Sequence, residues 1–117
     1  MRPLPEQPLT LAEIQAYVRN METERGFSDS TIVEQTLKLA EETGEVAKAV
    51  RERQALSIDS ASTIGDIGAE LADVLIYLAA IANRADIDLC DALRDKERLN
   101  ETRTWTAHQE TPSITST

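Results

Sequence analysis

Two pairs of acidic residues, each with i, i+3 spacing, are the part of this sequence best suited to chemistry. Glu42 and Glu45 form the first pair, and Glu70 and Asp73 form the second. A helix turns by about 100° per residue, so the two members of each pair share one side of a helix. Carboxylate oxygens are the ligands that Mg²⁺ and Mn²⁺ prefer. If neighbouring helices bring the two pairs together, the sequence predicts a site for a hard divalent cation.

The segment around the second pair favours a binding site over ordinary surface charge. From Ile67 to Ala82 the sequence IGAELADVLIYLAAIA is apolar nearly all round, which is typical of a helix buried on most sides. Glu70, Asp73 and Tyr77 fall within one arc of roughly 60° on that helix. Burying unpaired carboxylates is costly unless cations or protonation offset their charge. A bound metal would supply that offset.

Two other interpretations of the acidic residues stay open. The stretch EETGE is also compatible with a solvated helix face, because such charge spacing is common on surfaces. Nearby basic residues could also pair with the acids, namely Lys38, Lys48 or Arg51. We favour the metal, since a lysine or two cannot neutralise four clustered carboxylates. Zinc and di-iron sites are not indicated, because the sequence has one histidine, His108, and no Glu-x-x-His motif.

A third polar series lies further along the chain and carries positive charge. Lys96, Asn100 and Arg103 continue at helical spacing the line begun by Leu89 and Leu93, so we expect this line to point inward. Basic residues near a helix C-terminus also suit the helix dipole without any binding role. Beside a site of four carboxylates and a metal, these three side chains are suited to bind phosphate oxygens.

Helices must position all of these residues, because no run of the sequence alternates apolar and polar residues with the period of two that indicates a strand. We therefore predict an all-α fold, a compact four-helix bundle with helices at about residues 10–26, 31–53, 64–84 and 88–103. The end signals are capping boxes at Thr10 with Glu13 and at Thr31 with Glu34, a cap at Asp88, and a C-terminal stop at Gly26. The core face expected on the second helix consists of Ile32, Leu39, Thr43, Val46, Ala47 and Val50.

The chain divides into one folded domain and two flanking segments. We expect residues 1–9 to be an extended, proline-containing lead-in, residues 10–105 to form the helical domain, and residues 106–117 to be a flexible polar tail. A polar linker, Ser57 to Thr63, separates the second and third helices. Four helices of this size leave the apolar third helix hard to cover within one subunit, so self-association as a dimer or tetramer is expected.

Composition restricts the partners further. Twenty-one acidic against twelve basic residues give a net charge of −9, which repels a nucleic-acid backbone. The apolar stretch from Leu71 to Ala82 is too short to span a bilayer. The single cysteine, Cys90, cannot form an internal disulfide, and the start of the sequence lacks the pattern of a signal peptide. We expect a cytoplasmic protein with neither nucleic acid nor membrane as a partner.

Taken together, these motifs resemble the all-α nucleoside triphosphate pyrophosphohydrolases, the MazG-like family. The family pattern is Glu-Glu-x-x-Glu followed, a helix later, by Glu-x-x-Asp; here it stands as Glu41-Glu42-Thr43-Gly44-Glu45 and Glu70-Leu71-Ala72-Asp73. The stretch ELADVLIYLAAIANRADIDL and the later Lys96-x-x-x-Asn100-x-x-Arg103 extend the likeness over residues 10–105. Within the family, the sequence is most similar to the dCTP pyrophosphatase branch. That branch has further tryptophans and a histidine that this chain lacks, so the base preference stays open.

The resemblance implies a reaction and a set of roles. The reaction is hydrolysis of a (deoxy)nucleoside triphosphate to the monophosphate and pyrophosphate, with nucleotide-pool cleaning as its purpose. The cofactor is Mg²⁺, with Mn²⁺ as a substitute, and the implied ligands are Glu42, Glu45, Glu70 and Asp73. The implied phosphate-binding residues are Lys96, Asn100 and Arg103.

The remaining implied roles concern the base and the attacking water. By the resemblance, Tyr77 lies near the sugar or base, and Phe27 stacks on the base. Either Glu41 or Glu42 activates the water, and the sequence does not choose between them. The alternative from another class is a non-catalytic helical interaction module, in which the acids are surface charge. That alternative does not explain why Glu70, Asp73 and Tyr77 share one arc of an otherwise apolar helix.

Overall fold

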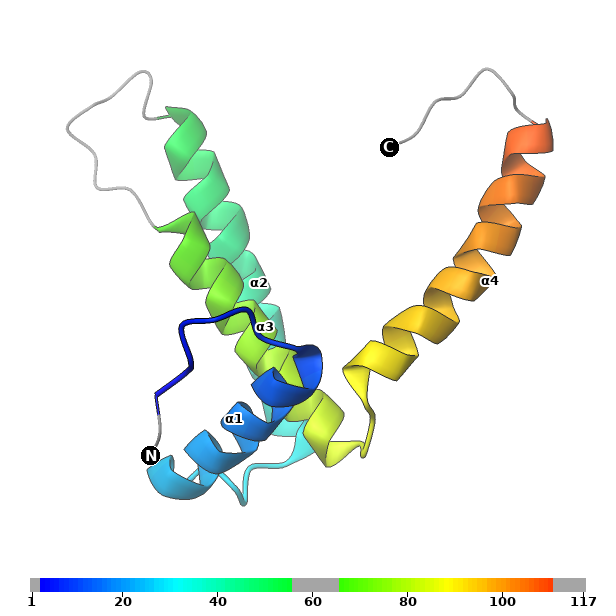
Figure 1. Ribbon diagram of the computed structural model, residues 1–117. Coiled ribbons are helices and arrows are strands. Elements are labelled where there is room, and N and C mark those ends of the chain that lie inside the picture. Colours follow the sequence, from blue (N-terminus) through cyan, green and yellow to red (C-terminus); the bar gives the residue numbers. More distant parts are fainter. Residues whose placement is uncertain (1–2, 56–65, 111–117) are drawn as a thin grey trace.

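The computed structural model describes residues 3–55 and 66–110, with the side chains of residues 3–54 and 66–103. All regular structure in these ranges is helical, which confirms the predicted all-α class (Figure 1). The four helices are α1 (Leu11–Arg25), α2 (Ile32–Ala55), α3 (Ile67–Arg84) and α4 (Leu89–Glu110). The order and number of helices agree with the prediction.

Short-range hydrogen bonds set most of the helix ends. In the first capping box the Glu13 N–H donates to Thr10 Oγ1 at 3.1 Å, and the Thr10 N–H donates to Glu13 Oε1 at 2.8 Å. Thr31 and Glu34 repeat this arrangement at the start of α2. Gly26 ends α1 in the left-handed conformation, with φ of 80°. These predicted ends are confirmed.

Helices α3 and α4 differ from the prediction at one end each. Asp66 caps α3 by accepting a hydrogen bond from the Ala69 N–H at 3.3 Å, so the helix begins at Ile67 rather than near residue 64. Asp88 caps α4 as expected, accepting from the Asp91 N–H at 2.9 Å. The helix then continues past residue 103 to Glu110, into the segment expected to be a tail. The expected linker at residues 57–63, and residues 111–117, lie outside the described residues.

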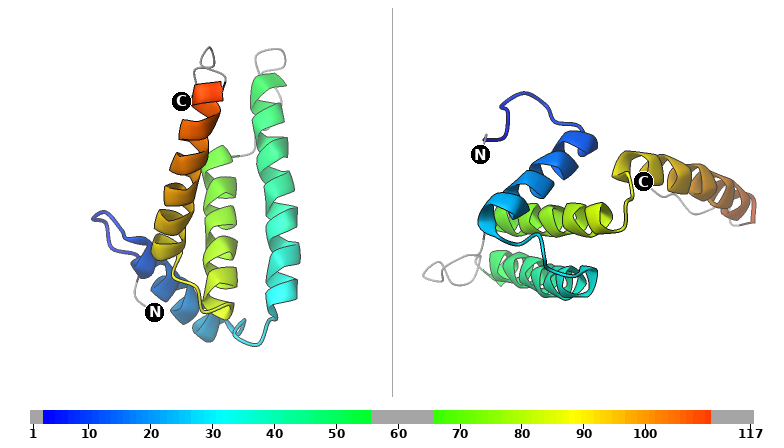
Figure 2. Two further views of the ribbon diagram at one scale, coloured as in Figure 1. Left: turned by 90° about the vertical axis from the view of Figure 1, so that its right-hand side faces the viewer. Right: turned by 90° about the horizontal axis from the view of Figure 1, so that it is seen from below.

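Helices α2 and α3 lie side by side as an antiparallel pair, and α1 packs across α3 near the end of the pair where α2 begins and α3 ends (Figures 1 and 2). The buried core joins Val18 and Met21 of α1 to Ala79 and Ala80 of α3. The small alanine side chains allow the two helix backbones to approach closely. This core holds α3, and therefore its acidic pair, in a defined orientation.

The buried seam of α2 is rotated from the predicted one. Its most buried residues are Gln35 and Ala49, with the partly buried Leu39, Glu42 and Val46 between them at helical spacing. The core face predicted for this helix was therefore wrong in part: Ile32 and Val50 are 40% and 43% exposed, and Thr43 and Ala47 are also exposed. Within the chain α2 packs mainly on α3, which covers only a narrow stripe. Glu42 lies within that stripe.

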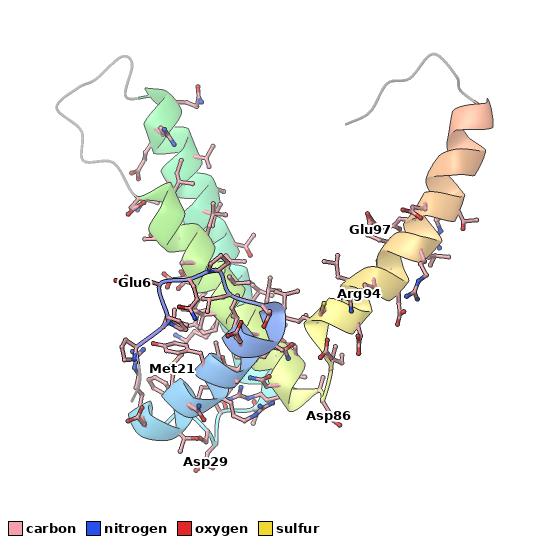
Figure 3. The ribbon with its side chains drawn as sticks, viewed as in Figure 1. Glu6, Met21, Asp29, Asp86, Arg94 and Glu97 are labelled. Atoms are coloured by element: carbon pink, nitrogen blue, oxygen red, sulfur yellow. The ribbon has the colours of Figure 1, made fainter. Side chains whose placement is uncertain are left out.

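The fourth helix stands away from the others. It packs against α1 near its own beginning but not along α2 or α3 (Figures 1 and 2). The radius of gyration is 18.2 Å, against about 13 Å for a compact domain of this length. The predicted bundle is thus open within one subunit. Arg94 and Glu97, labelled in Figure 3, project from this separate helix.

A buried polar contact at the α3–α4 turn fixes the direction of α4. Gln15 of α1 is only 7% exposed. Its Nε2 donates to Asn83 Oδ1 at 3.0 Å and to the Ile87 carbonyl at 2.8 Å, while its Oε1 accepts from the Leu89 N–H at 2.9 Å. Asp86, at the corner of this turn in Figure 3, has a positive φ of 57°. We call this set of contacts the Gln15 elbow. Because both ends of the Gln15 amide are hydrogen-bonded, the elbow holds the start of α4 in a direction that leads away from α2 and α3.

Candidate active site

Three carboxylates converge between α2 and α3. Glu42, Glu70 and Asp73 each offer an oxygen that lies within 4.8 Å of the other two. The spacing within α3 places Glu70 and Asp73 on one side, and Glu42 meets them because it lies on the buried seam of α2. The predicted convergence of acids from the second and third helices is therefore present in the structure. We call these three residues the acidic cluster.

The basic residues nearest in sequence do not neutralise the acidic cluster. Lys38 pairs with Glu41 at 3.7 Å, and Lys48 pairs with Glu52 at 4.0 Å. Among the side chains of residues 3–54 and 66–103, no lysine or arginine forms an ion pair with Glu42, Glu70 or Asp73. The alternative of ordinary salt bridging is thus unsupported within these residues.

The electrostatics of Glu42 reflect this crowding. Loss of hydration raises the pKa of the Glu42 carboxyl, and the neighbouring charges of Asp73 and Glu70 raise it further, followed by Glu45 and Glu41. The raised pKa means that the environment of Glu42 in the folded protein disfavours the ionised carboxylate. A partly buried cluster of carboxylate oxygens fits a hard divalent ion such as Mg²⁺.

The other two acids of the second helix lie at the edge of this arrangement. Glu45 is exposed and does not belong to the acidic cluster, although its charge acts on Glu42. Glu41 is also exposed, and its pair with Lys38 is between side chains that are largely in solvent, so it contributes little to stability. Of the four predicted metal ligands, the structure brings three together and leaves Glu45 one turn away on α2.

The residues expected near the base lie on two different elements. Tyr77 is partly buried on α3, one turn beyond Asp73. Phe27 lies in the loop between α1 and α2, and it is 52% exposed. Its exposure is unusual for the single phenylalanine of the chain, because phenylalanine is often buried. The ring is therefore available for contact with another molecule.

The predicted phosphate-binding residues are not brought to the acidic cluster within one chain. Lys96 and Arg103 are exposed on α4, and the Asn100 amide donates to Glu97 Oε2 at 2.8 Å. The line that should point inward does not, since Leu93 on the same line is 57% exposed. The Gln15 elbow explains the difference, because it directs α4 away from α2 and α3.

Sequence reasoning missed a buried ion pair at the end of α3. Arg84 Nη1 lies 2.9 Å from Glu22 Oε2, and the two side chains are 13% and 10% exposed. The same guanidinium contacts the loop that carries Phe27. An arginine in the last turn of a helix has an ordinary explanation in the helix dipole, so the sequence carried no signal for this pair.

Comparison with known proteins identifies the family. Residues 30–103, which include α2, α3 and most of α4, match the MazG nucleotide pyrophosphohydrolase domain. This chain belongs to that family, and the resemblance seen in the sequence is confirmed at that level. The dCTP pyrophosphatase branch within it stays a prediction.

A relative with a named activity also matches. The dATP/dGTP diphosphohydrolase of Salmonella phage PMBT28 is 38% identical over 96 residues, a match that covers 82% of this chain and 28% of the relative. The chain thus spans less than a third of that relative's length. In the described part of the chain, no helix is long and apolar enough to cross a membrane.

Proposed function

We propose that this protein hydrolyses a (deoxy)nucleoside triphosphate between its α and β phosphates, producing the monophosphate and pyrophosphate in a Mg²⁺-dependent reaction. The observation that carries the proposal is the acidic cluster: three carboxylates from two helices meet, and no described lysine or arginine forms an ion pair with them, in a chain of the MazG family. Glu42, Glu70 and Asp73 would hold the metal, and Glu45, one turn along α2, would be the fourth ligand.

The chemistry divides between the cofactor and the protein. When bound, a divalent ion supplies positive charge for the phosphates and lowers the pKa of the attacking water. Glu42 and Glu41 are the two candidates to accept the proton of that water. Glu42 lies in the acidic cluster and would be engaged as a metal ligand, whereas the exposed Glu41 would stay available to accept the proton. Tyr77, one turn along α3, would contact the sugar or base.

Lys96, Asn100 and Arg103 would bind the phosphates from a second copy of the chain. This arrangement is supported by the outward direction of α4, which keeps these residues from their own subunit's acids. Exposed leucines on α3, at Leu71 and Leu78, need a cover, and Leu93 and Leu99 on α4 are similarly exposed. The negative acidic cluster and the basic residues of α4 are complementary in charge. Self-association as a dimer or tetramer would satisfy both needs.

The choice of base is best approached through the relatives. The name of the phage protein puts dATP and dGTP first in a substrate panel, and the likeness to the dCTP branch adds dCTP. Hydrolysis of such compounds would serve nucleotide-pool cleaning. The exposed Phe27 would stack on any of these bases, because every base has a π-face.

The test is a pyrophosphate-release assay on ribo- and deoxyribonucleoside triphosphates with Mg²⁺, with Mn²⁺ and with a chelator. Metal-dependent formation of the monophosphate is the expected result. Glu70→Gln should abolish turnover with the helical content kept, and Glu6→Gln, in the exposed lead-in, is the matched control. A folded, metal-loaded protein without turnover on the whole panel would instead support a non-catalytic interaction module, which the exposed leucines of α3 also fit.

A further inference from the structure

Arg84 joins three parts of the molecule through one side chain. Its Nη1 donates to both carboxylate oxygens of Glu22 on α1, at 3.1 and 2.9 Å, and to the Ala80 carbonyl of its own helix at 3.0 Å. Its Nε donates to the Ser30 carbonyl at 2.7 Å, and its Nη2 donates to the Phe27 carbonyl at 3.1 Å. The last two contacts bind both ends of the short segment from residue 27 to residue 30.

Only part of this arrangement requires arginine. A lysine could supply the positive charge that the buried Glu22 needs, and a buried ion pair is in any case weak evidence of a stabilising role. The planar guanidinium, in contrast, presents several N–H donors in fixed directions. Here those additional donors are used on the two loop carbonyls. The specific contribution of Arg84 is therefore to hold the loop.

Other contacts make the same loop rigid. The Phe27 N–H donates to the Glu22 carbonyl at 2.8 Å, and the Ser30 N–H donates to the Phe27 carbonyl at 3.0 Å. The buried Gln35 of α2 donates to Ser30 Oγ at 2.8 Å. The loop is thus held from three helices: the Phe27 backbone from α1 and α3, and the Ser30 side chain from α2. Phe27 itself is nevertheless 52% exposed. A loop that served only to fill the core would bury the Phe27 ring. This loop is held rigidly and leaves Phe27 accessible to another molecule.

The position of Arg84 along α3 relates the loop to the acidic cluster. Asp73 lies in the first half of the helix and Arg84 ends it, which places them about 16 Å apart along the axis at about 1.5 Å per residue. Tyr77 lies between them. This separation is comparable to the length of an extended nucleoside triphosphate, with its phosphates at one end and its base at the other.

We propose that Arg84 is a positioning residue for base recognition: by holding the Phe27 and Ser30 carbonyls, it fixes the Phe27 ring as a stacking surface for the nucleotide base. The inference rests on the proposed function. It assigns the metal and phosphate chemistry to the acidic cluster and α4, and it makes the α1–α2 loop the base-binding end.

The first test is Arg84→Lys, which keeps a charge for Glu22 but cannot reach both loop carbonyls as well. KM for the preferred triphosphate should rise about tenfold, the scale of losing one base–aromatic stack, while kcat changes by less than about threefold. Phe27→Ala should have the same effect. Combined, the two changes should be no worse than either alone, because Arg84 acts through Phe27.

Three controls separate positioning from stability. Glu22→Gln removes the ion pair but leaves the loop contacts, so it should lower the melting temperature and leave KM unchanged. Arg98→Lys alters an exposed pair with Asp95 on α4 and should change neither. Inhibition by inorganic pyrophosphate, which has no base, should be equal in wild type and Arg84→Lys, whereas inhibition by the nucleoside monophosphate should weaken in the variant.

If Arg84→Lys does not fold, the double variant Glu22→Gln with Arg84→Gln replaces it, since no unpaired charge is then buried. Its KM should rise as for Phe27→Ala. The proposal is overturned if Phe27→Ala leaves KM unchanged, if the effects of Phe27→Ala and Arg84→Lys multiply, or if pyrophosphate inhibition weakens equally. Wild-type turnover, measured first, separates these outcomes from a failure of the proposed function, because its absence would overturn both.

Discussion

A carboxylate oxygen of Glu42 on α2 lies within 4.8 Å of a carboxylate oxygen of Asp73 on α3. Two like charges at this distance repel, and Asp73 is the neighbouring charge that contributes most to raising the pKa of Glu42. A fold that gained only stability from these positions would not retain such a pair. A bound cation would offset this repulsion, as in the metal site that we propose.

Removing the Glu42 charge should stabilise the metal-free protein. A carboxyl whose pKa is raised by folding favours the folded state at low pH, and this contribution is lost as pH rises through the folded pKa. In chelator, Glu42→Gln should therefore melt at a higher temperature than wild type at neutral pH. The difference should shrink as the solution becomes acidic. Thermal melts across pH check this, and a lower melting temperature for the variant at neutral pH would contradict it.

Divalent metal should stabilise the folded protein through the acidic cluster. A ligand that binds only the folded state raises the melting temperature, and a concentration of a hundred times Kd contributes about 2.7 kcal/mol. For a domain of this size, Mg²⁺ at that concentration should thus raise the melting temperature by about 10 °C, at about 4 °C per kcal/mol. Glu70→Gln should lose most of that shift, and Glu6→Gln should keep it. A wild-type melting temperature indifferent to Mg²⁺ and Mn²⁺ would remove the metal from the proposed site.

Breaking the Gln15 elbow should destabilise the fold and release α4. Gln15→Leu removes the partner of the Ile87 carbonyl and of the Leu89 N–H, whereas Asn83 Oδ1 keeps its hydrogen bond from Arg19 Nη2. A buried unsatisfied group costs about 1–3 kcal/mol. Denaturant unfolding should record that loss, with Gln7→Leu in the exposed lead-in as the control. Solution scattering should also show a changed distribution of shapes. A Gln15→Leu protein as stable as wild type would mean that other contacts direct α4.

The partner subunit should complete the site in trans. If α4 of a second copy supplies the phosphate contacts, Glu70→Gln and Lys96→Ala subunits are each inactive alone, but a mixed dimer has one intact site. Refolding the two together should restore about a quarter of wild-type turnover after random pairing. A mixture that stays inactive, although light scattering shows mixed oligomers, would place Lys96 and Glu70 of one site in the same subunit.

The exposed leucines of α3 should hold the subunits together. Leu71→Glu or Leu78→Glu adds a charge to a face that is 53% or 41% exposed in one chain, so the monomer should tolerate it while the oligomer does not. Light scattering should record a smaller particle, with helical content kept in circular dichroism. An unchanged particle mass would direct the search for the interface to other surfaces.

Features that depend on neighbours in sequence were predictable. The capping boxes at Thr10 and Thr31 arise from residues three positions apart, and the stop at Gly26 needs only the freedom of glycine at positive φ. The pairing of Glu70 with Asp73 likewise follows from helical spacing. These local rules suffice for four helices and for which acids share a side.

Features that depend on residues far apart in the sequence were not predictable. The seam of α2 runs through Glu42 rather than Ile32 and Val50 because the stripe is chosen by what α3 covers. Nothing near Gln15 in the sequence indicates that its side chain meets Asn83 and the start of α4, and nothing near Arg84 indicates the loop at Phe27.

By itself, then, the sequence determined the all-α class, the helix ends at Thr10 and Thr31, and the carboxylates available for a metal, because each of these is a property of one helix. The tertiary structure alone decided which acids converge and where α4 points. Those outcomes depend on hydrogen bonds and packing between residues far apart in the chain, such as Gln15 with Asn83 and Arg84 with Glu22. The energies of these long-range contacts cannot be inferred from the spacing of residues within one helix.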